Sequence, residues 1–301
     1  MKIPVTFLGT AQAIPTKKRN HVSMLLSYGS ENILIDCGEG TQKQLRIAKI
    51  NPCKITTILI THWHGDHVLG LPGLFQTLAL NGYNKKMKIY GPKGTKRFLK
   101  NFIHIFIPVL KFRAEVREVS GKFFETKDFE IHAQKLKHGK APCNGYAFKE
   151  RDKLRINKNK LKKLKISHED KKKLIQLTQG KSIKIKGKTI KPKQLTYLQK
   201  GKKISFILDT KVCPNVKKLA KDSDLAIIEA TYANTEKSLG SKYGHLTAEQ
   251  AAKIAKQGKA KQLILTHISQ RYEKNESILL KQAKKIFKNT KLANDFDKVE
   301  V

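Results

Sequence analysis

The sequence predicts an α/β fold built in layers, and three observations support this expectation. Short apolar runs of strand length alternate along the chain with longer segments of helical periodicity. Gly, Pro and polar clusters separate these runs, as turns between elements do. The chain has 301 residues, 39% of them hydrophobic, which is enough to enclose a core without disulfide staples. Alternating strands and helices are typical of mixed α/β proteins.

The expected elements follow from the apolar runs and their period. In the first half of the chain they are strands at Ile3–Leu8, Val22–Ser27, Ile33–Ile35 and Ile55–Ile60, and helices at Thr41–Lys49 and 68–81. In the second half they are strands at Phe129–Leu136, Ile204–Leu208, Leu225–Ile228 and 262–265, and helices at 247–257 and 276–288.

Residues 151–200 differ from the rest of the chain in charge. They hold 18 Lys and Arg against three acids, a net charge of +15, and a single aromatic residue. A helix is expected over Lys158–Leu177 and a hairpin over Ile183–Ile190. So few apolar residues cannot bury much core, and we therefore expect a basic arm inserted into one domain that spans residues 1–301. A disordered basic linker is the alternative.

The whole chain carries a net charge of +38, from 62 Lys and Arg against 24 Asp and Glu. A charge this large indicates a polyanionic partner, nucleic acid before an anionic membrane surface. The alternative is a lysine-rich proteome whose proteins carry a solvated basic coat. No membrane span or secretory leader is expected, because no sufficiently long apolar run occurs. The four scattered cysteines indicate a cytoplasmic protein without disulfides or a thiolate zinc site.

The densest cluster of ligand-type residues follows the expected strand Ile55–Ile60. In the run T-H-W-H-G-D-H, His62 and His64 lie two apart, so in extended backbone they point the same way and suit one zinc ion. Asp66 and His67 follow a glycine that permits a tight turn, and they can face a second metal. Four such residues within six positions predict a metal centre.

Two metals with open positions need further ligands, and other strand ends provide candidates. His138, Asp209 and His267 each come directly after an expected apolar strand. Singly, such residues are more often structural. As a set of three, placed where loops at a sheet edge converge, they would complete the centre.

The H-x-H-x-D-H motif, followed by a His, an Asp and a His at strand ends, resembles the metallo-β-lactamase superfamily. Finer motifs resemble its ribonuclease Z family, endonucleases that trim the 3′ end of precursor tRNA. These motifs lie in colinear order over about residues 1–272: Pro15-Thr16-Lys17-Lys18-Arg19-Asn20, Asp36-Cys37-Gly38-Glu39-Gly40-Thr41-Gln42, Gly70-Leu71-Pro72-Gly73-Leu74, Pro142-Cys143-Asn144-Gly145-Tyr146, Leu208-Asp209-Thr210, Glu229-Ala230-Thr231 and His267-Ile268-Ser269-Gln270-Arg271-Tyr272.

The resemblance implies an αβ/βα four-layer sandwich with two zinc ions per subunit, or manganese in their place. It assigns the first ion to His62, His64 and His138 and the second to Asp66, His67 and His267, with Asp209 bridging both. By the same resemblance, Asp36 orients a ligand loop.

Catalytic and binding roles are implied in the same way. Asp66 would accept or orient the proton of the attacking water, and His245 would protonate the departing 3′-oxygen while Glu229 holds its ring. The product would be a tRNA with a 3′-hydroxyl and a trailer with a 5′-phosphate. The expected substrate-binding residues are Lys17, Arg19 and the arm lysines Lys158, Lys162, Lys163, Lys184, Lys186 and Lys188.

The expected partners are precursor tRNA and a second copy of the chain in a cytoplasmic homodimer, with no membrane. The arm would bind tRNA by shape, because the deep major groove of A-form RNA cannot be read by side chains. Two alternatives use the same fold: a hydrolase of a small thioester, lactam or phosphodiester, and a non-catalytic RNA-binding relative.

Overall fold

The computed structural model describes residues 2–107, 110–162, 164, 168–185 and 187–301, and the chain divides into two compact units. Unit 1 comprises Met1–Phe124, Ile131–Phe148 and Lys203–Val301, and unit 2 comprises Glu125–Glu130 and Lys149–Lys202. Among the described helices, none is long and apolar enough to cross a membrane.

The first sheet of unit 1 has seven strands. Three of them form an antiparallel meander, and three more add in parallel because helices connect them. From one edge to the other, the strands are β18 (Lys298–Glu300), β1 (Pro4–Gly9), β2 (Ser23–Tyr28), β3 (Glu31–Ile35), β4 (Thr57–Leu59), β5 (Met87–Gly91) and β6 (Ala114–Glu118).

The second sheet also has seven strands and includes four parallel neighbours, β14 to β17. In order they are β17 (Thr290–Leu292), β16 (Leu263–Thr266), β15 (Leu225–Glu229), β14 (Lys203–Ile207), β9 (Ala141–Glu150), β8 (Phe129–His138) and β7 (Gly121–Glu125). The pairing of Ile207 with Ile228, and of Ile228 with Leu265, aligns the carboxyl ends of three strands.

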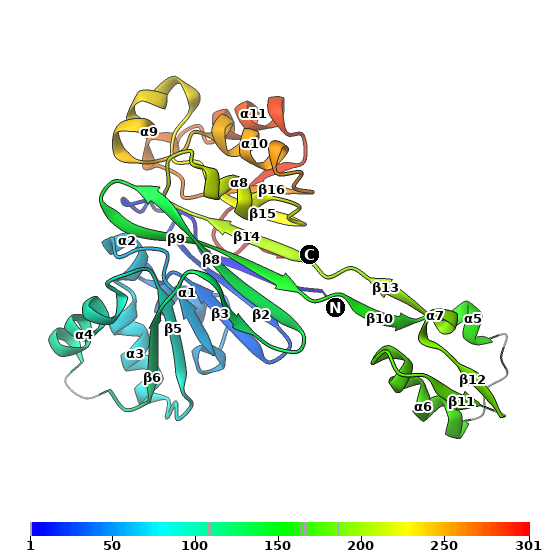
Figure 1. The fold of residues 1–301 in the computed structure, drawn as a ribbon. Helices are drawn as coiled ribbons and strands as arrows, with labels where there is room; N and C mark the ends of the chain where they lie inside the picture. Colours follow the sequence, from blue (N-terminus) through cyan, green and yellow to red (C-terminus); the bar gives the residue numbers. More distant parts are fainter. Residues whose placement is uncertain (1, 108–109, 163, 165–167, 186) are drawn as a thin grey trace. The chain divides into compact units, whose positions relative to one another are not determined.

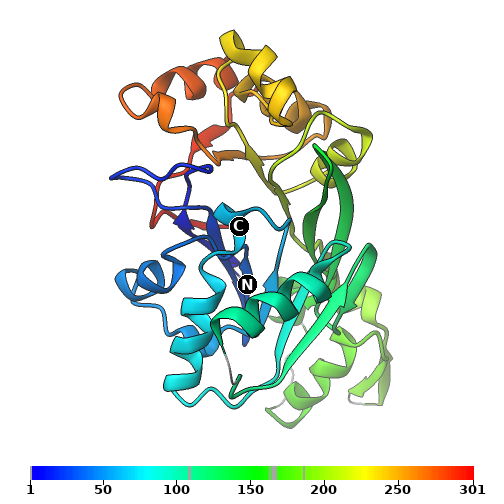
Figure 2. The ribbon, with the colours of Figure 1, turned by 90° about the vertical axis from the view of Figure 1, so that its left-hand side faces the viewer.

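Helices cover the outer face of each sheet in unit 1. The first sheet carries α1 (Thr41–Ile47), η1 (Pro52–Lys54), α2 (Gly65–Val68), α3 (Leu71–Leu80) and α4 (Thr95–Phe106). The second carries α8 (Pro214–Ala220), α9 (Lys237–Tyr243), α10 (Ala248–Gln257) and α11 (Ser277–Ile286). The 3-10 turns η2 (Asn234–Glu236) and η3 (Gln270–Tyr272) lie in its connecting segments. Two views show these helix groups on opposite sides of the paired sheets (Figures 1 and 2).

The layers follow from where the apolar residues lie. One buried cluster joins the first sheet to its helices, including Leu34, Ile58 and Leu74, and another joins the second sheet to α8, α10 and α11. Between the sheets, the Tyr146 hydroxyl donates to the Ile60 carbonyl at 2.6 Å, and Tyr90 packs against Phe123. The αβ/βα four-layer sandwich that the resemblance implied is confirmed.

Unit 2 is a small folded body with its own core. Leu174, Leu177, Ile183, Ile185 and Leu195 are buried together. The elements around them are β10 (Lys153–Ile156), α5 (Lys158–Lys162), α6 (His168–Thr178), β11 (Ile183–Ile185), β12 (Lys188–Ile190), α7 (Pro192–Leu195) and β13 (Thr196–Gln199). Strands β10 and β13 form an antiparallel ladder that ends at the Ile156–Thr196 pair.

Two expectations for this segment were wrong. In the described residues, the single helix expected over Lys158–Leu177 is two helices, α5 and α6, with Leu164 in a turn between them. The expectation that the arm buries little core overlooked five apolar residues spaced among the lysines. The described part of unit 2 is therefore ordered structure, in contrast to a disordered linker.

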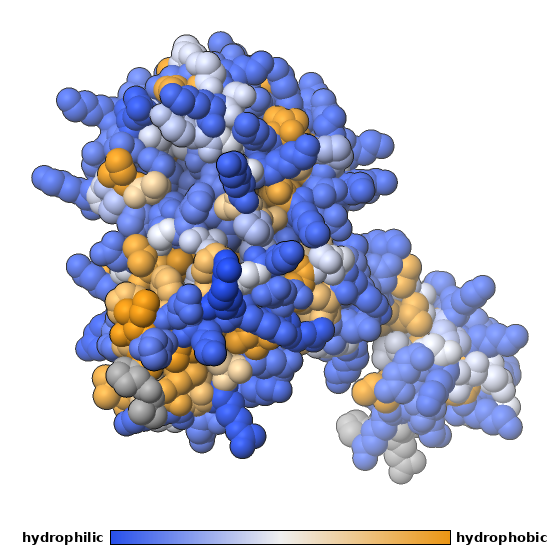
Figure 3. All heavy atoms as spheres, turned by 60° about the vertical axis from the view of Figure 1, so that its left-hand side comes forward, coloured by the Kyte–Doolittle hydropathy of each residue, from blue (hydrophilic) through white to orange (hydrophobic). Residues whose placement is uncertain are grey.

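The expected hairpin is present, since Ile185 pairs with Lys188 across a turn that contains Gly187 in the left-handed region at φ 77°. Hydrophilic side chains cover most of the face shown in Figure 3, in keeping with the net charge of +38.

Candidate metal centre

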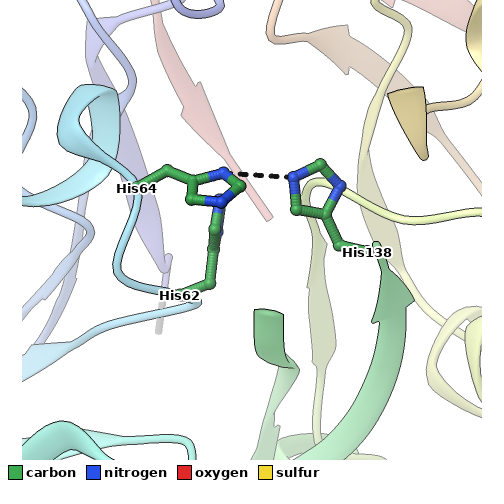
Figure 4. Close-up of side chains that lie close together, drawn as sticks. All are labelled: His62, His64 and His138. Carbon is green, nitrogen blue, oxygen red and sulfur yellow. Dashed lines mark hydrogen bonds between the residues drawn. The ribbon is translucent and has the colours of Figure 1, made fainter. Parts of the chain in front are cut away.

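The loop after β4 brings three histidines of the expected first metal site together. His62 and His64 leave this loop on the same side, and His138 meets them from the end of β8 (Figure 4). Their ring nitrogens lie within 4.8 Å of one another, and the His138 Nε2 to His64 Nδ1 distance is 3.2 Å. His62 and His138 are buried, whereas His64 is exposed, so this side of the centre is open to solvent.

The expected second metal site forms beside the first. Asp66, His67, Asp209 and His267 place one ligand atom each within 4.8 Å of one another. They come from the start of α2 and from the carboxyl ends of β14 and β16, which pair in parallel with β15 between them and so end at the same edge of the sheet. His267 has a φ of 60°, a left-handed conformation that is uncommon for histidine and that turns the chain at the end of its strand.

Asp209 lies between the two groups, with one carboxylate oxygen toward each. Its Oδ1 is 3.2 Å from His67 Nε2 and 3.1 Å from His267 Nε2. Its Oδ2 is 3.8 Å from His62 Nε2 and 3.7 Å from His138 Nε2. This is the placement that a bridging ligand requires.

Unpaired buried atoms test whether a metal fits here. Within the described residues, His62 Nε2, His67 Nε2 and Asp209 Oδ1 are buried without a hydrogen-bond partner. A buried polar atom without a partner costs free energy, and these three atoms all face the same small space. Cations coordinated by imidazole and carboxylate would satisfy them, and this donor set suits zinc.

In His67, His138 and His267, a hydrogen bond holds the ring nitrogen Nδ1. Asp36 Oδ2 is 2.7 Å from His67 Nδ1 and also accepts from the Thr61 hydroxyl at 2.7 Å, as expected of a residue that orients the ligand loop. His138 Nδ1 lies 3.0 Å from the Gly244 carbonyl, and His267 Nδ1 lies 2.9 Å from the Thr231 hydroxyl. These contacts fix the tautomers that leave Nε2 free for a metal.

The pKa shifts of the candidate ligands differ, since burial opposes the charged form of His67 but Asp209, Asp66 and Asp36 outweigh burial and raise its pKa. Burial lowers the pKa of His62 and of His64, which favours neutral rings. Burial alone would raise the pKa of Asp66 and Asp209, but the facing His67 and His267 outweigh it and hold both pKa values below their usual range. Both acids are therefore carboxylates at neutral pH.

His245 and Glu229 form a pair at the edge of the centre. Glu229, fully buried at the end of β15, places Oε2 at 3.1 Å from His245 Nδ1 and accepts from the Thr231 hydroxyl at 2.6 Å. Burial opposes the charged form of His245, but Glu229 and Asp209 raise its pKa to about 9. The His245 side chain lines the pocket, and Glu229 holds only its Nδ1.

A pocket of about 400 Å³ opens onto these groups. His64, His138 and His245 line one part of it. The rest of the lining comes from Gln12, Ala13, Ile14, Tyr232, Tyr243, Ser269, Gln270 and Arg271. The pocket thus places an aromatic and polar wall next to the ligand cluster.

Comparison with known proteins agrees with this geometry. Family models match two parts of the chain, one described as anti-Pycsar protein Apyc1 at residues 3–106 and one as beta-lactamase superfamily domain at residues 174–268. A ribonuclease Z of Pyrococcus horikoshii is 40% identical over 302 residues, covering 99% of this chain and 96% of the relative. The chain belongs to the ribonuclease Z family. Another member, from Methanothermobacter thermautotrophicus, is 36% identical over 299 residues and covers 99% of this chain and 96% of its own.

Solved structures share the fold. The short form of human tRNase Z has 28% identity and a TM-score of 0.70, covering 98% of both chains. The metallo-beta-lactamase fold protein YhfI from Bacillus subtilis has a TM-score of 0.71 at 17% identity over the full length of both chains, which shows the fold alone. The predicted family, its metallo-β-lactamase fold and its enzyme class are confirmed.

The residues expected to bind the substrate differ from one another in how exposed they are. Lys17 is exposed on its loop, and the arm lysines Lys158, Lys162, Lys184 and Lys188 are exposed on unit 2. Lys163 and Lys186 lie outside the described residues.

Arg19 contradicts its expected role. Its side chain is only 3% exposed and is paired with Glu276, so its guanidinium is not available to a substrate phosphate. The residue lies in a motif of the ribonuclease Z family, but the motif does not reveal a partner 257 positions away.

Sequence reasoning missed some residues that hold the centre. Thr231 and the Gly244 carbonyl position His267 and His138. Thr231 follows Glu229 by two residues, and this proximity was the available signal. The Gly244 contact is made by a backbone carbonyl, so the residue type at this position does not predict it, and the neighbouring His245 was the only signal nearby.

Proposed function

We propose that this chain is the zinc-dependent endonuclease that removes the 3′ trailer from precursor tRNA. The observation that carries the proposal is Asp209, whose two oxygens face two separate groups of ligand-type side chains. Membership of the ribonuclease Z family supplies the substrate, since relatives of this chain are named ribonuclease Z and tRNase Z.

Seven residues would hold two zinc ions, with manganese as the alternative. One ion would take His62, His64 and His138, the other Asp66, His67 and His267, and Asp209 would serve both. When bound, two such ions lower the pKa of water and offset charge on phosphoryl oxygens.

The chain's own residues would handle the protons. Asp66 Oδ2 lies 3.3 Å from His67 Nε2 and 3.4 Å from His267 Nε2, so its carboxylate can accept and orient the proton of an attacking water. Glu229 holds His245 through Nδ1, which leaves the other ring nitrogen to protonate the departing 3′-oxygen. The products are a tRNA with a 3′-hydroxyl and a trailer with a 5′-phosphate.

The basic arm would bind the body of the tRNA. Its residues Lys158, Lys162, Lys184 and Lys188 are exposed, and phosphate contacts from such lysines are insensitive to sequence and weaken with salt. Lys17 would contact RNA near the cleavage point. From the family resemblance we also infer a cytoplasmic homodimer in which the arm of one subunit reaches tRNA at the other subunit's centre.

The test is cleavage of a precursor tRNA by the purified protein, by chelator-treated protein and by the treated protein after zinc is restored. The proposal predicts that the purified protein cleaves the precursor, that the chelator-treated protein does not, and that zinc restores cleavage more fully than manganese does. A protein that hydrolyses small diesters, thioesters or lactams but leaves the precursor intact would be a small-molecule hydrolase. Binding of tRNA with no hydrolysis of any substrate would indicate a non-catalytic relative.

A further inference from the structure

Arg19 is a buried cation whose hydrogen bonds are all satisfied. It lies in the 12–20 loop, the segment between β1 and β2, and a guanidinium has five N–H donors. Five contacts are present, one for each donor. The guanidinium reaches Glu276 Oε1 at 2.5 Å and Oε2 at 2.6 Å, Thr10 Oγ1 at 2.6 Å, the Ala293 carbonyl at 2.6 Å and Asn294 Oδ1 at 3.1 Å.

A second contact ties the same loop to the same C-terminal segment. Asp295 accepts from the Asn20 backbone N–H at 2.7 Å and from the Thr10 hydroxyl at 2.7 Å. It also accepts from Gln44 at 3.0 Å, which links the loop to α1. The loop is thus attached at its end to residues 293–295, which precede the edge strand β18.

The other limb of the 12–20 loop faces the metal centre, where the Gln12 N–H donates to the Ile268 carbonyl at 3.2 Å and its Nε2 donates to Gln270 Oε1 at 2.9 Å. Gln12, Ala13 and Ile14 line the pocket that also contains His64, His138 and His245. The loop tip is closed by a turn, in which the Thr16 N–H donates to the Arg19 carbonyl at 2.8 Å. Fixing Arg19 therefore fixes the base of a turn whose other limb is a wall of the pocket.

We propose that Arg19 is a positioning residue, and that its clamp to Glu276 holds the 12–20 loop as the wall that seats the nucleotide beside the scissile phosphodiester. The inference rests on the proposed function for the identity of that nucleotide. A guanidinium buried this deeply has to be paired, and its planar, bidentate geometry allows one arrangement of the loop. A displacement of about 1 Å at a reacting group can cost roughly 100-fold in rate.

Arg19→Lys and Glu276→Gln test the clamp, because both keep polar groups of similar size and neither can form the bidentate charged pair. Hydrogen exchange reports on the loop without reference to activity. The amides of residues 11–20 are expected to exchange at least tenfold faster in each variant, while those of β14, β15 and β16 keep their wild-type rates. Unchanged exchange in the loop would overturn the clamp.

Kinetics separate positioning from a direct contact and from a general loss of stability. In each variant, kcat/KM for precursor tRNA should fall at least tenfold more than kcat/KM for bis-4-nitrophenyl phosphate. The double variant should lose no more activity than the less active of the two single variants. The slope of log kcat/KM against log salt should stay at the wild-type value. Parallel losses on both substrates would indicate a merely structural role, and a slope reduced by about 0.7 would indicate a direct phosphate contact.

Lys17→Ala is the matched control from the same loop. Its side chain is exposed, so it should reduce the salt slope and leave loop exchange at the wild-type rate. If the wild-type protein fails to cut precursor tRNA, the proposed function fails, and the exchange measurement alone decides whether the clamp orders the loop.

Discussion

The candidate metal centre of unit 1 and the basic arm of unit 2 differ in how their side chains are held. In the centre, His67, His138 and His267 are buried, and each is held through its second nitrogen by Asp36, by a carbonyl or by Thr231. On the arm, a small apolar core carries lysines that are exposed. Hydrolysis needs atoms fixed to a fraction of an ångström, whereas binding an RNA backbone needs charge density more than fixed geometry.

The largest expected effect separates chemistry from binding. Asp66→Ala removes a proposed metal ligand and the proposed proton acceptor for the attacking water, so cleavage should fall by roughly 1,000-fold or more. Binding of precursor tRNA, measured by a filter or mobility assay, should stay within about threefold of wild type because the exposed lysines are untouched. Normal turnover by Asp66→Ala would remove this residue from the mechanism.

Replacing the arm should have the opposite effect. Residues 157–195 can be exchanged for a two-residue Asn-Gly turn, because Ile156 and Thr196 are already paired across the β10–β13 ladder. KM for precursor tRNA should rise by roughly 100-fold because the arm lysines no longer bind its phosphates, while hydrolysis of bis-4-nitrophenyl phosphate should continue. An equal loss on both substrates would contradict a substrate-binding arm.

A smaller effect tests the support beneath the centre. Asp36→Asn keeps the size of the side chain but weakens its hold on His67 Nδ1, so affinity for zinc should fall by about 10- to 100-fold. Competition with a zinc-binding dye measures this directly. Glu39, on the same loop but exposed, provides a control, and a Glu39→Gln variant should keep wild-type affinity.

The smallest effect concerns individual charges. Changing four exposed arm lysines to Gln should reduce the salt slope of kcat/KM by about 0.7–0.9 for each RNA phosphate that the variant no longer neutralises. The four are Lys158, Lys162, Lys184 and Lys188. A control set of four exposed lysines on unit 1 consists of Lys217, Lys218, Lys221 and Lys259, which surround a pocket at the ends of α8 and α10. Equal slopes for the two quadruple variants would mean that the arm has no special part in binding.

Local sequence was sufficient for the features that depend on neighbouring residues. The apolar runs around Ile58 and Ile264 predicted buried strands, and the histidines that follow them predicted a metal centre. The strand-end positions of His138, Asp209 and His267 supplied the remaining candidates, and the resemblance divided the ligands between two ions. The structure brings all seven residues together.

Features that depend on distant partners were not predictable in this way. Strand β18 has one apolar residue, Val299, and forms because it pairs with β1 at the other end of the chain. Arg19 is a surface residue by composition, and its burial depends on Glu276 and residues 293–295. The core of unit 2 was hidden because its apolar residues are scattered among lysines and gather only after the chain folds.

The most direct test of the account is to map the ends of the products from a precursor tRNA with a defined trailer. An endonuclease built on this centre predicts a single cut at the 3′ end of the tRNA, with a 3′-hydroxyl on the tRNA and an intact trailer bearing a 5′-phosphate. A ladder of shortened trailers, a 3′-phosphate on the tRNA, or an uncut precursor with zinc-loaded protein would contradict it.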